Sequence, residues 1–134
     1  MSITITLTDK DKSTLRTAAY GAVSLMAASG APHKGISHGS IALTSATGLV
    51  GHVLAAKSKD IHLPGKSVAE LADHVLPALT AAMGLLTTRD PAEADNFRTT
   101  VLVAVDTAIQ SRRGAPSPTV AAMADKITAA LDAA

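Results

Sequence analysis

Residues 35–56 read GISHGSIALTSATGLVGHVLAA and contain no Asp, Glu, Lys or Arg. The only ionisable side chains in this stretch are those of His38 and His52. Because an exposed helix carries charges on its outer face, a charge-free stretch of this length predicts a helix that is surrounded by protein. We therefore expect a helix over Ser37 to Lys57 at the centre of the fold. Its buried face should comprise Leu43, Val50, Val53 and Leu54.

The composition of the whole chain favours a single all-α domain over residues 1–134. A chain of 134 residues can bury one core without metal or disulfide support, whereas two domains would each be small. Apolar residues make up 47% of the chain and charged residues 17%, which excludes a disordered, highly charged segment. Since aromatic residues contribute only 1%, Ala supplies much of the apolar mass, and Ala has the highest helix propensity. We expect a bundle of about five helices around the central apolar one.

Capping signals mark where the other helices begin. Thr8 with Asp11 predicts a helix that Gly30 ends, and Ser67 with Glu70 forms a capping box for another helix. Two more helices should begin at the cap-plus-proline pairs Asp90-Pro91 and Ser117-Pro118.

The segment 1–7 is the one strand-like part of the chain. Ile3, Ile5 and Leu7 alternate with polar residues, which is the period of a half-buried strand. A lone strand needs a partner. We expect this extended N-terminal arm to lie across the helices or to pair with the same segment of a second subunit.

A stripe of three polar residues runs along the predicted helix over 37–57. His38, Ser45 and His52 are seven residues apart and would therefore lie along nearly one side of a continuous helix. One interpretation is a polar seam that lines a ligand pocket or a subunit interface. The alternative is an ordinary solvent-facing or hydrogen-bonded side of a helix. The spacing does not suit a shared metal ion, because two ligands on one helix usually lie four residues apart.

Pro77 lies inside the helix that Ser67 begins. It cannot donate a hydrogen bond to the carbonyl of Asp73, so we expect a kink or a break into two short helices there. A kinked turn with a free carbonyl can bind a ligand, which makes Asp73 and His74 candidate ligand-binding residues. The alternative is a solvated helix face, because adjacent helical residues point about 100° apart and would need a third group.

Several function classes find no support in the sequence. The net charge of +1 does not favour a nucleic-acid or membrane-surface partner, although a loop containing Lys57 and Lys66 keeps anion binding as a third alternative. The chain has no Cys, no nucleophile elbow and no His pair at metal-ligand spacing. We therefore assign no catalytic residue, no metal and no cofactor, and catalysis has little positive support.

The location that the sequence predicts is the cytoplasm. The segment 1–7 lacks the basic region and continuous apolar run of a signal peptide. Residues 35–56 are long enough to cross a membrane, but their Ser, Thr and His side chains lower the hydrophobicity, so we expect no membrane insertion.

The leading functional expectation is a non-catalytic interaction or structural module that self-associates, as a homodimer. It rests on the charge-free segment, on the small side chains at 42–51 that would let another helix approach closely, and on the N-terminal arm. The alternative is a small-ligand or metal-binding protein, or an enzyme, with its site near Pro77 and the stripe of His38 and His52.

Overall fold

The protein folds as an all-α bundle, as the sequence predicts. The computed structural model describes residues 7–30, 39, 41–44, 46–55, 67–110 and 117–133, and every regular element within these ranges is helical. A short helical turn covers 41–44. The longer elements are α1 (Asp9–Ala28), α3 (Gly48–Ala55), α4 (Val68–Arg89), α5 (Pro91–Gln110) and α6 (Pro118–Asp132). Of the N-terminal arm, only Leu7 lies within the described residues, where it is buried.

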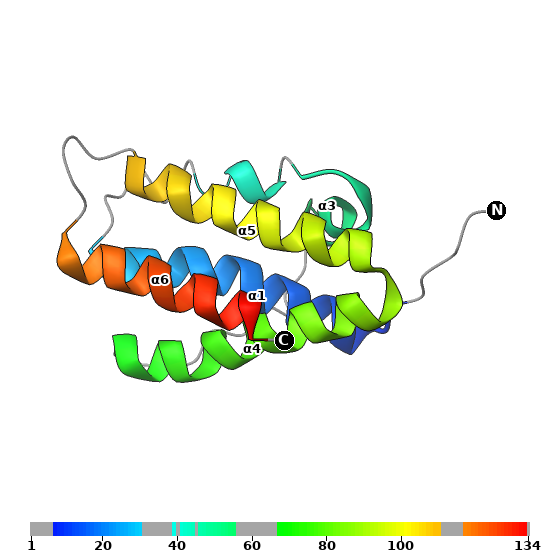
Figure 1. The fold of residues 1–134 in the computed structure, drawn as a ribbon, viewed down its shortest axis with the longest axis horizontal. Helices are drawn as coiled ribbons and strands as arrows, with labels where there is room; N and C mark the ends of the chain where they lie inside the picture. Colours follow the sequence, from blue (N-terminus) through cyan, green and yellow to red (C-terminus); the bar gives the residue numbers. More distant parts are fainter. Residues whose placement is uncertain are drawn as a thin grey trace.

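The central helix of the bundle is α1. It packs against α3, α4, α5 and α6, and Figure 1 shows it between α5 and α4. Three of its inward side chains are Ala, which lets these neighbours approach closely. The expected inner face is confirmed, because all of the following are buried: Leu15, Ala18, Ala19, Ala22, Val23 and Met26. Helix α3, which is part of the segment that we expected at the centre, instead packs against α1 and α5.

The capping signals define the helix boundaries correctly. Thr8 and Asp11 form the expected capping box, and Gly30, with a φ of 112°, follows the end of α1. Ser67 accepts a hydrogen bond from the Glu70 amide at 3.2 Å. The side chain of Asp90 accepts one from the Ala92 amide at 3.1 Å, and that of Ser117 accepts one from the Val120 amide at 3.3 Å.

The prediction of one continuous helix over 37–57 is wrong. Residues 46 and 47 are not helical, and α3 begins only at Gly48, whose φ is 74°. A left-handed φ cannot continue a right-handed helix, so the chain turns here. A Cβ on Gly51 would also collide with the backbone carbonyl oxygen of Ala46, so the turn is too tight for any side chain there. The expected buried face is confirmed nonetheless, because Leu43, Val50, Val53 and Leu54 are all at most 1% exposed.

Pro77 does not divide α4. The helix continues from Val68 to Arg89 with the proline inside it, so of the two expected outcomes the break into two short helices is wrong and the kink stays a prediction. Proline costs the helix a backbone hydrogen bond, but the surrounding turns are held by their packing in the core. The residues of α4 that provide this packing are Val75, Leu79, Ala82, Met83 and Leu86.

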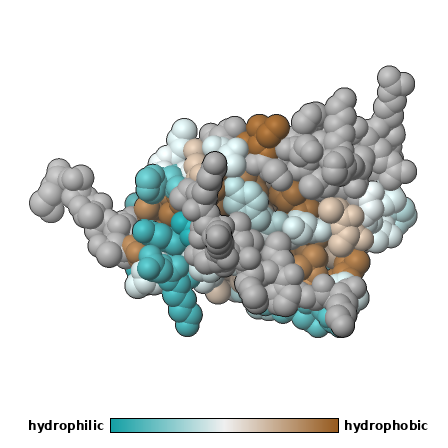
Figure 2. Space-filling view, turned by 180° about the vertical axis from the view of Figure 1, so that it is seen from behind, coloured by the Kyte–Doolittle hydropathy of each residue, from teal (hydrophilic) through white to brown (hydrophobic). Residues whose placement is uncertain are grey.

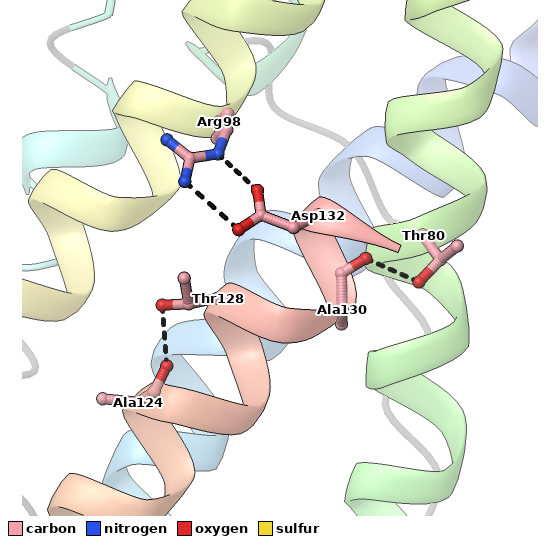
Figure 3. Close-up of polar contacts among 6 residues, drawn as sticks. All are labelled: Thr80, Arg98, Ala124, Thr128, Ala130 and Asp132. Carbon is pink, nitrogen blue, oxygen red and sulfur yellow. Dashed lines mark hydrogen bonds and ion pairs between the residues drawn. The ribbon is translucent and has the colours of Figure 1, made fainter. Parts of the chain in front are cut away.

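Helix α6 is tied to two neighbours by polar contacts (Figure 3). The Arg98 guanidinium on α5 donates to both carboxylate oxygens of Asp132, at 2.8 and 3.4 Å. On the other side, the Thr80 hydroxyl of α4 donates to the carbonyl of Ala130 at 2.7 Å. The hydrogen bond and charge of Arg98 lower the pKa of Asp132 below its ordinary value, and those of Asp132 raise the pKa of Arg98.

Among the described helices, α4 is long and apolar enough to cross a membrane by length and composition alone. The core helix of a bundle can have the same length and composition, and one face of α4 packs in the core.

Candidate functional site

A groove runs between the amino-terminal half of α1 and the middle of α4. The two helices are antiparallel, and an ion pair between Asp11 and Arg89, 3.1 Å apart, joins them at one end. The groove is open to solvent and has a volume of about 450 Å³. This size lies within the range of about 300–1,000 Å³ that is typical of small-molecule sites. Its lining comprises Lys10, Ser13, Thr14, Thr17, His74, Pro77, Ala78 and Ala81.

The helical repeat explains why these residues line one groove. On each helix the lining positions recur at intervals of three or four residues, and such positions share a helix face. The face from α1 carries an ammonium and three hydroxyl groups, whereas the face from α4 is small and apolar except at His74. The groove therefore has a polar wall and an apolar wall.

The polar wall presents groups that can bind a polar ligand. Lys10 is exposed, so its ammonium is hydrated in the free protein and can reach a ligand in the groove. The Thr14 hydroxyl donates to the carbonyl of Lys10 at 3.0 Å, which leaves its oxygen lone pairs as acceptors. Thr17 is only 7% exposed and lies deeper than Lys10. The wall thus offers a charge near the rim and hydroxyl groups along α1.

The candidate residues on α4 and α3 do not share one site. His74 lines the groove beside Pro77, and its role in binding a ligand stays a prediction. Asp73 is exposed on α4 and is not part of the lining, because the adjacent position on a helix points in another direction. His52 is exposed on α3 and does not line the groove either.

The polar stripe along 37–57 is not supported by a continuous helix. His38 and Ser45 lie outside the described residues, so their surroundings are not part of this description. His52 belongs to α3, which the non-helical residues 46 and 47 separate from the preceding helical turn. The seven-residue spacing therefore does not place these side chains along a single helix face.

A second polar cluster holds both ends of α3. At its amino end, the Glu93 carboxylate of α5 accepts from the amides of Leu49 and Val50, at 2.6 and 3.3 Å. The Asn96 amide group donates to the carbonyl of Thr47 at 2.8 Å, and it lies 3.4 Å from the other carboxylate oxygen of Glu93. The Glu93 contacts satisfy two amides that α3 leaves unpaired at its start, whereas the Thr47 carbonyl also accepts from the Gly51 amide at 3.2 Å.

The carboxyl end of α3 is held by α1. The guanidinium of Arg16, which is only 7% exposed, donates from Nε to the carbonyl of Val53 at 3.0 Å. The Tyr20 hydroxyl donates to the carbonyl of Leu54 at 2.7 Å, and burial raises the pKa of this tyrosine. Since these groups meet backbone atoms, their observed role is structural.

No metal site is found in the part of the chain that the structure describes. Within these residues, no group of three or more His, Asp or Glu side chains is close enough to hold an ion.

Figure 2 shows the described hydrophobic residues of one face in several separate areas. Ile41 and Val103 are the large hydrophobic residues that are most exposed within the described ranges, at 61% and 50%. Scattered residues of this kind are ordinary on a monomer, so the groove is the better candidate for a binding site.

Sequence reasoning missed the polar wall from α1. The residues Lys10, Ser13, Thr14 and Thr17 show the helical interval of a single face, and this pattern could have identified the wall. The position of α4 opposite this face could not be derived, because it depends on how the two helices pack.

Comparisons of the chain with protein-family models, with curated proteins and with solved structures found no match.

Proposed function

We propose that this protein is a helical binding module that holds a small organic ligand in the groove between α1 and α4. The observation that carries the proposal is the groove itself, whose polar wall from α1 faces an apolar wall from α4 around His74 and Pro77. Small-molecule sites commonly combine apolar surface with a few oriented polar groups.

A binding role fits this groove better than catalysis does. The groove is open to solvent along its length, whereas enzymes commonly exclude water from the reacting groups. Among the described residues that line the groove, His74 could act as a general acid or base, but none is a carboxylate.

The ligand hypothesis takes precedence over self-association because of where the charge-free segment lies. Self-association was expected partly from a helix over 37–57 with a face left for a second chain. In the structure, α3 is short, packs against α1 and α5, and buries Val50, Val53 and Leu54 within its own bundle. That segment therefore has an intramolecular explanation.

The test is a ligand screen with a variant that fills the groove. Ala81 is exposed and lines the groove, so Ala81→Trp should obstruct binding without disturbing the core. Ala122 is exposed on α6, away from the groove, so Ala122→Trp is the matched control. A fragment library would be screened by nuclear magnetic resonance on the intact chain. We expect hits that shift groove resonances and are lost in Ala81→Trp alone. Hits that survive Ala81→Trp, or no hits, would refute the proposal.

Self-association is a second candidate function, through the side of α4 that carries Gly84. Gly84 lies in the interior of this helix, where glycine costs about 1 kcal/mol relative to alanine. A Cβ at this position would meet nothing within 4 Å, so packing inside the described protein does not require glycine. Close approach of another helix would explain the residue.

A second copy is the partner that the charges of α4 suit. Glu70 and Asp73 lie near its amino end, and Arg89, which pairs with Asp11 of its own chain, lies at its carboxyl end. If two copies of α4 pair in antiparallel orientation, the acidic end of each lies beside the basic end of the other, as in an isologous dimer.

Light scattering over a concentration series tests this second candidate. We expect a dimer at tens of micromolar, and Gly84→Arg should convert it to a monomer because the side chain blocks close approach. Ala122→Arg, which adds the same charge on α6, should remain dimeric. A monomer at every concentration, or a dimer that Gly84→Arg leaves intact, would refute it.

A further inference from the structure

We infer that the ligand of the groove is a small organic monocarboxylate, with its carboxylate on the polar wall of α1 and an apolar body on the wall of α4. This inference rests on the proposed binding function and adds the chemical class of the ligand.

The charge of the lining favours an anionic head group. Among the described residues that line the groove, Lys10 carries the permanent charge, and none is acidic. The Thr14 hydroxyl already donates to the carbonyl of Lys10, so recognition of a carboxylate rests on the ammonium of Lys10, and hydrogen bonds between ionised and polar partners are stronger than neutral ones. A cationic ligand would meet Lys10 without a compensating carboxylate in the lining.

The acidic residues near the groove do not reverse this preference. The carboxylate of Asp11 accepts from the Thr8 amide at 3.1 Å and pairs with Arg89, so it serves the helix start and the contact with α4. Asp73 lies outside the lining. Glu70 lies one helical turn before His74 and is the acidic group that should weaken anion binding at that end of the groove.

The wall of α4 suits an unbranched apolar body. Pro77, Ala78 and Ala81 present short side chains without hydrogen-bonding groups, which leaves room between the helices and gives a flat apolar surface. Burial of each CH₂ group on such a surface adds affinity without a polar partner. A carboxylate on a short alkyl chain therefore matches both walls.

Matched eight-carbon probes separate head-group preference from groove binding. Octanoate, octan-1-ol and octylamine share the alkyl chain and differ in the head group. Binding would be measured by nuclear magnetic resonance titration of the whole chain. We expect octanoate to bind at least about tenfold more tightly than octan-1-ol, which corresponds to one charge-assisted contact. Octylamine should bind more weakly than either.

Variants test which side chain recognises the carboxylate. Lys10→Met keeps the aliphatic stem and should reduce octanoate affinity about tenfold while leaving octan-1-ol unchanged. Lys126→Met, on the exposed surface of α6, is the matched control and should change neither. Glu70→Gln should strengthen octanoate binding, and added salt should weaken it.

The outcomes distinguish this inference from the function on which it rests. Octan-1-ol or octylamine binding as tightly as octanoate, or octanoate binding that Lys10→Met leaves unchanged, would overturn the carboxylate inference while groove binding stands. Failure of all three probes would also overturn it, and the fragment screen with Ala81→Trp then decides whether the groove binds any ligand.

Discussion

Glu93 and Gly48 act together at the start of α3. Gly48 has a φ of 74°, and a Cβ there would lie 2.7 Å from one carboxylate oxygen of Glu93. The absent side chain therefore gives the carboxylate access to the first amides of the helix. Sequence reasoning recognised the charge-free segment 35–56. It did not recognise this acceptor, because Glu93 belongs to a helix that begins far along the chain. The position of Glu93 shortly after Asp90-Pro91 indicated only an acidic residue in the first turn of α5.

Replacement by alanine should change the free energy of unfolding in opposite directions at two glycines. Gly48→Ala should lower the free energy of unfolding by about 1–2 kcal/mol, because alanine is strained at positive φ and its Cβ meets Glu93. Gly84→Ala should raise it by about 1 kcal/mol, because the position is helical and open. Urea unfolding followed by circular dichroism measures both. Equal effects of the same sign would contradict the assigned backbone roles.

The hydrogen bonds that Glu93 accepts from the start of α3 should contribute measurably to the free energy of unfolding. Glu93→Ala should lower the free energy of unfolding by about 1–2 kcal/mol, because it leaves the amides of Leu49 and Val50 without their acceptor. Glu93→Gln should lower it less, because it keeps an acceptor oxygen. Amide hydrogen exchange at Leu49 and Val50 should accelerate in Glu93→Ala. Asp125→Ala on α6 is the surface control, and no difference from it would show that the cap is unimportant.

At the scale of single helices, capping residues predicted where a helix begins better than the sequence predicted whether a helix is interrupted. Thr8, Ser67 and Asp90 each accept the amide hydrogen bond that their position at a helix start implies, because capping depends on residues within one turn. The interruption before Gly48 was not predicted, and of the two outcomes expected at Pro77 the break into two helices was wrong. Each depends on packing against other helices, which outweighs local preference.

Replacement of Pro77 should stabilise α4. Pro77→Ala restores an amide donor for the Asp73 carbonyl and should raise the free energy of unfolding by about 2 kcal/mol, since the greater freedom of the unfolded chain offsets only part of the gain. Pro91→Ala is the matched control. This proline lies at the first position of α5, where no helical donor is missing, so its replacement should change stability by less than about 0.5 kcal/mol. Destabilisation by Pro77→Ala would contradict this account.

At the scale of the whole molecule, composition predicted the fold class but not the arrangement. The abundance of Ala and the inner face from Leu15 to Met26 were sufficient to predict an Ala-rich bundle. They did not show that α1 would lie at its centre, because any of the long helices could have filled that place. His74 and Pro77, which the sequence singled out as near a possible site, line the groove, whereas its second wall required the antiparallel pairing of α1 and α4.

The contact between α5 and α6 should contribute to the pH dependence of stability. The pKa of Asp132 is lowered by its hydrogen bond with Arg98 and by the charge of that residue. The stabilisation is therefore present above the unfolded-state pKa of about 3.9 and is lost as the pH falls through the lowered, folded-state value. Asp132→Asn should flatten the acid side of a plot of unfolding free energy against pH.

A double-mutant cycle provides the control for this pH effect. Arg98→Gln should flatten the same acid limb, and the variant that carries both substitutions should show little further change, because the two residues act as one pair. Additive effects of the two substitutions would indicate that the pH dependence arises elsewhere.

The residues that hydrogen-bond to the two ends of α3 are synthesised at different times. The carbonyls of Val53 and Leu54 pair with Arg16 and Tyr20, which are made 37 and 34 residues earlier than their partners. Leu49 must wait for Glu93, which follows 44 residues later. A growing chain can therefore anchor the end of α3 on α1 before its beginning has an acceptor. Closure of this long loop is entropically costly. We expect docking of α5 to be the step that orders α3, and the apolar side chains of α3 to be most vulnerable to aggregation before that step.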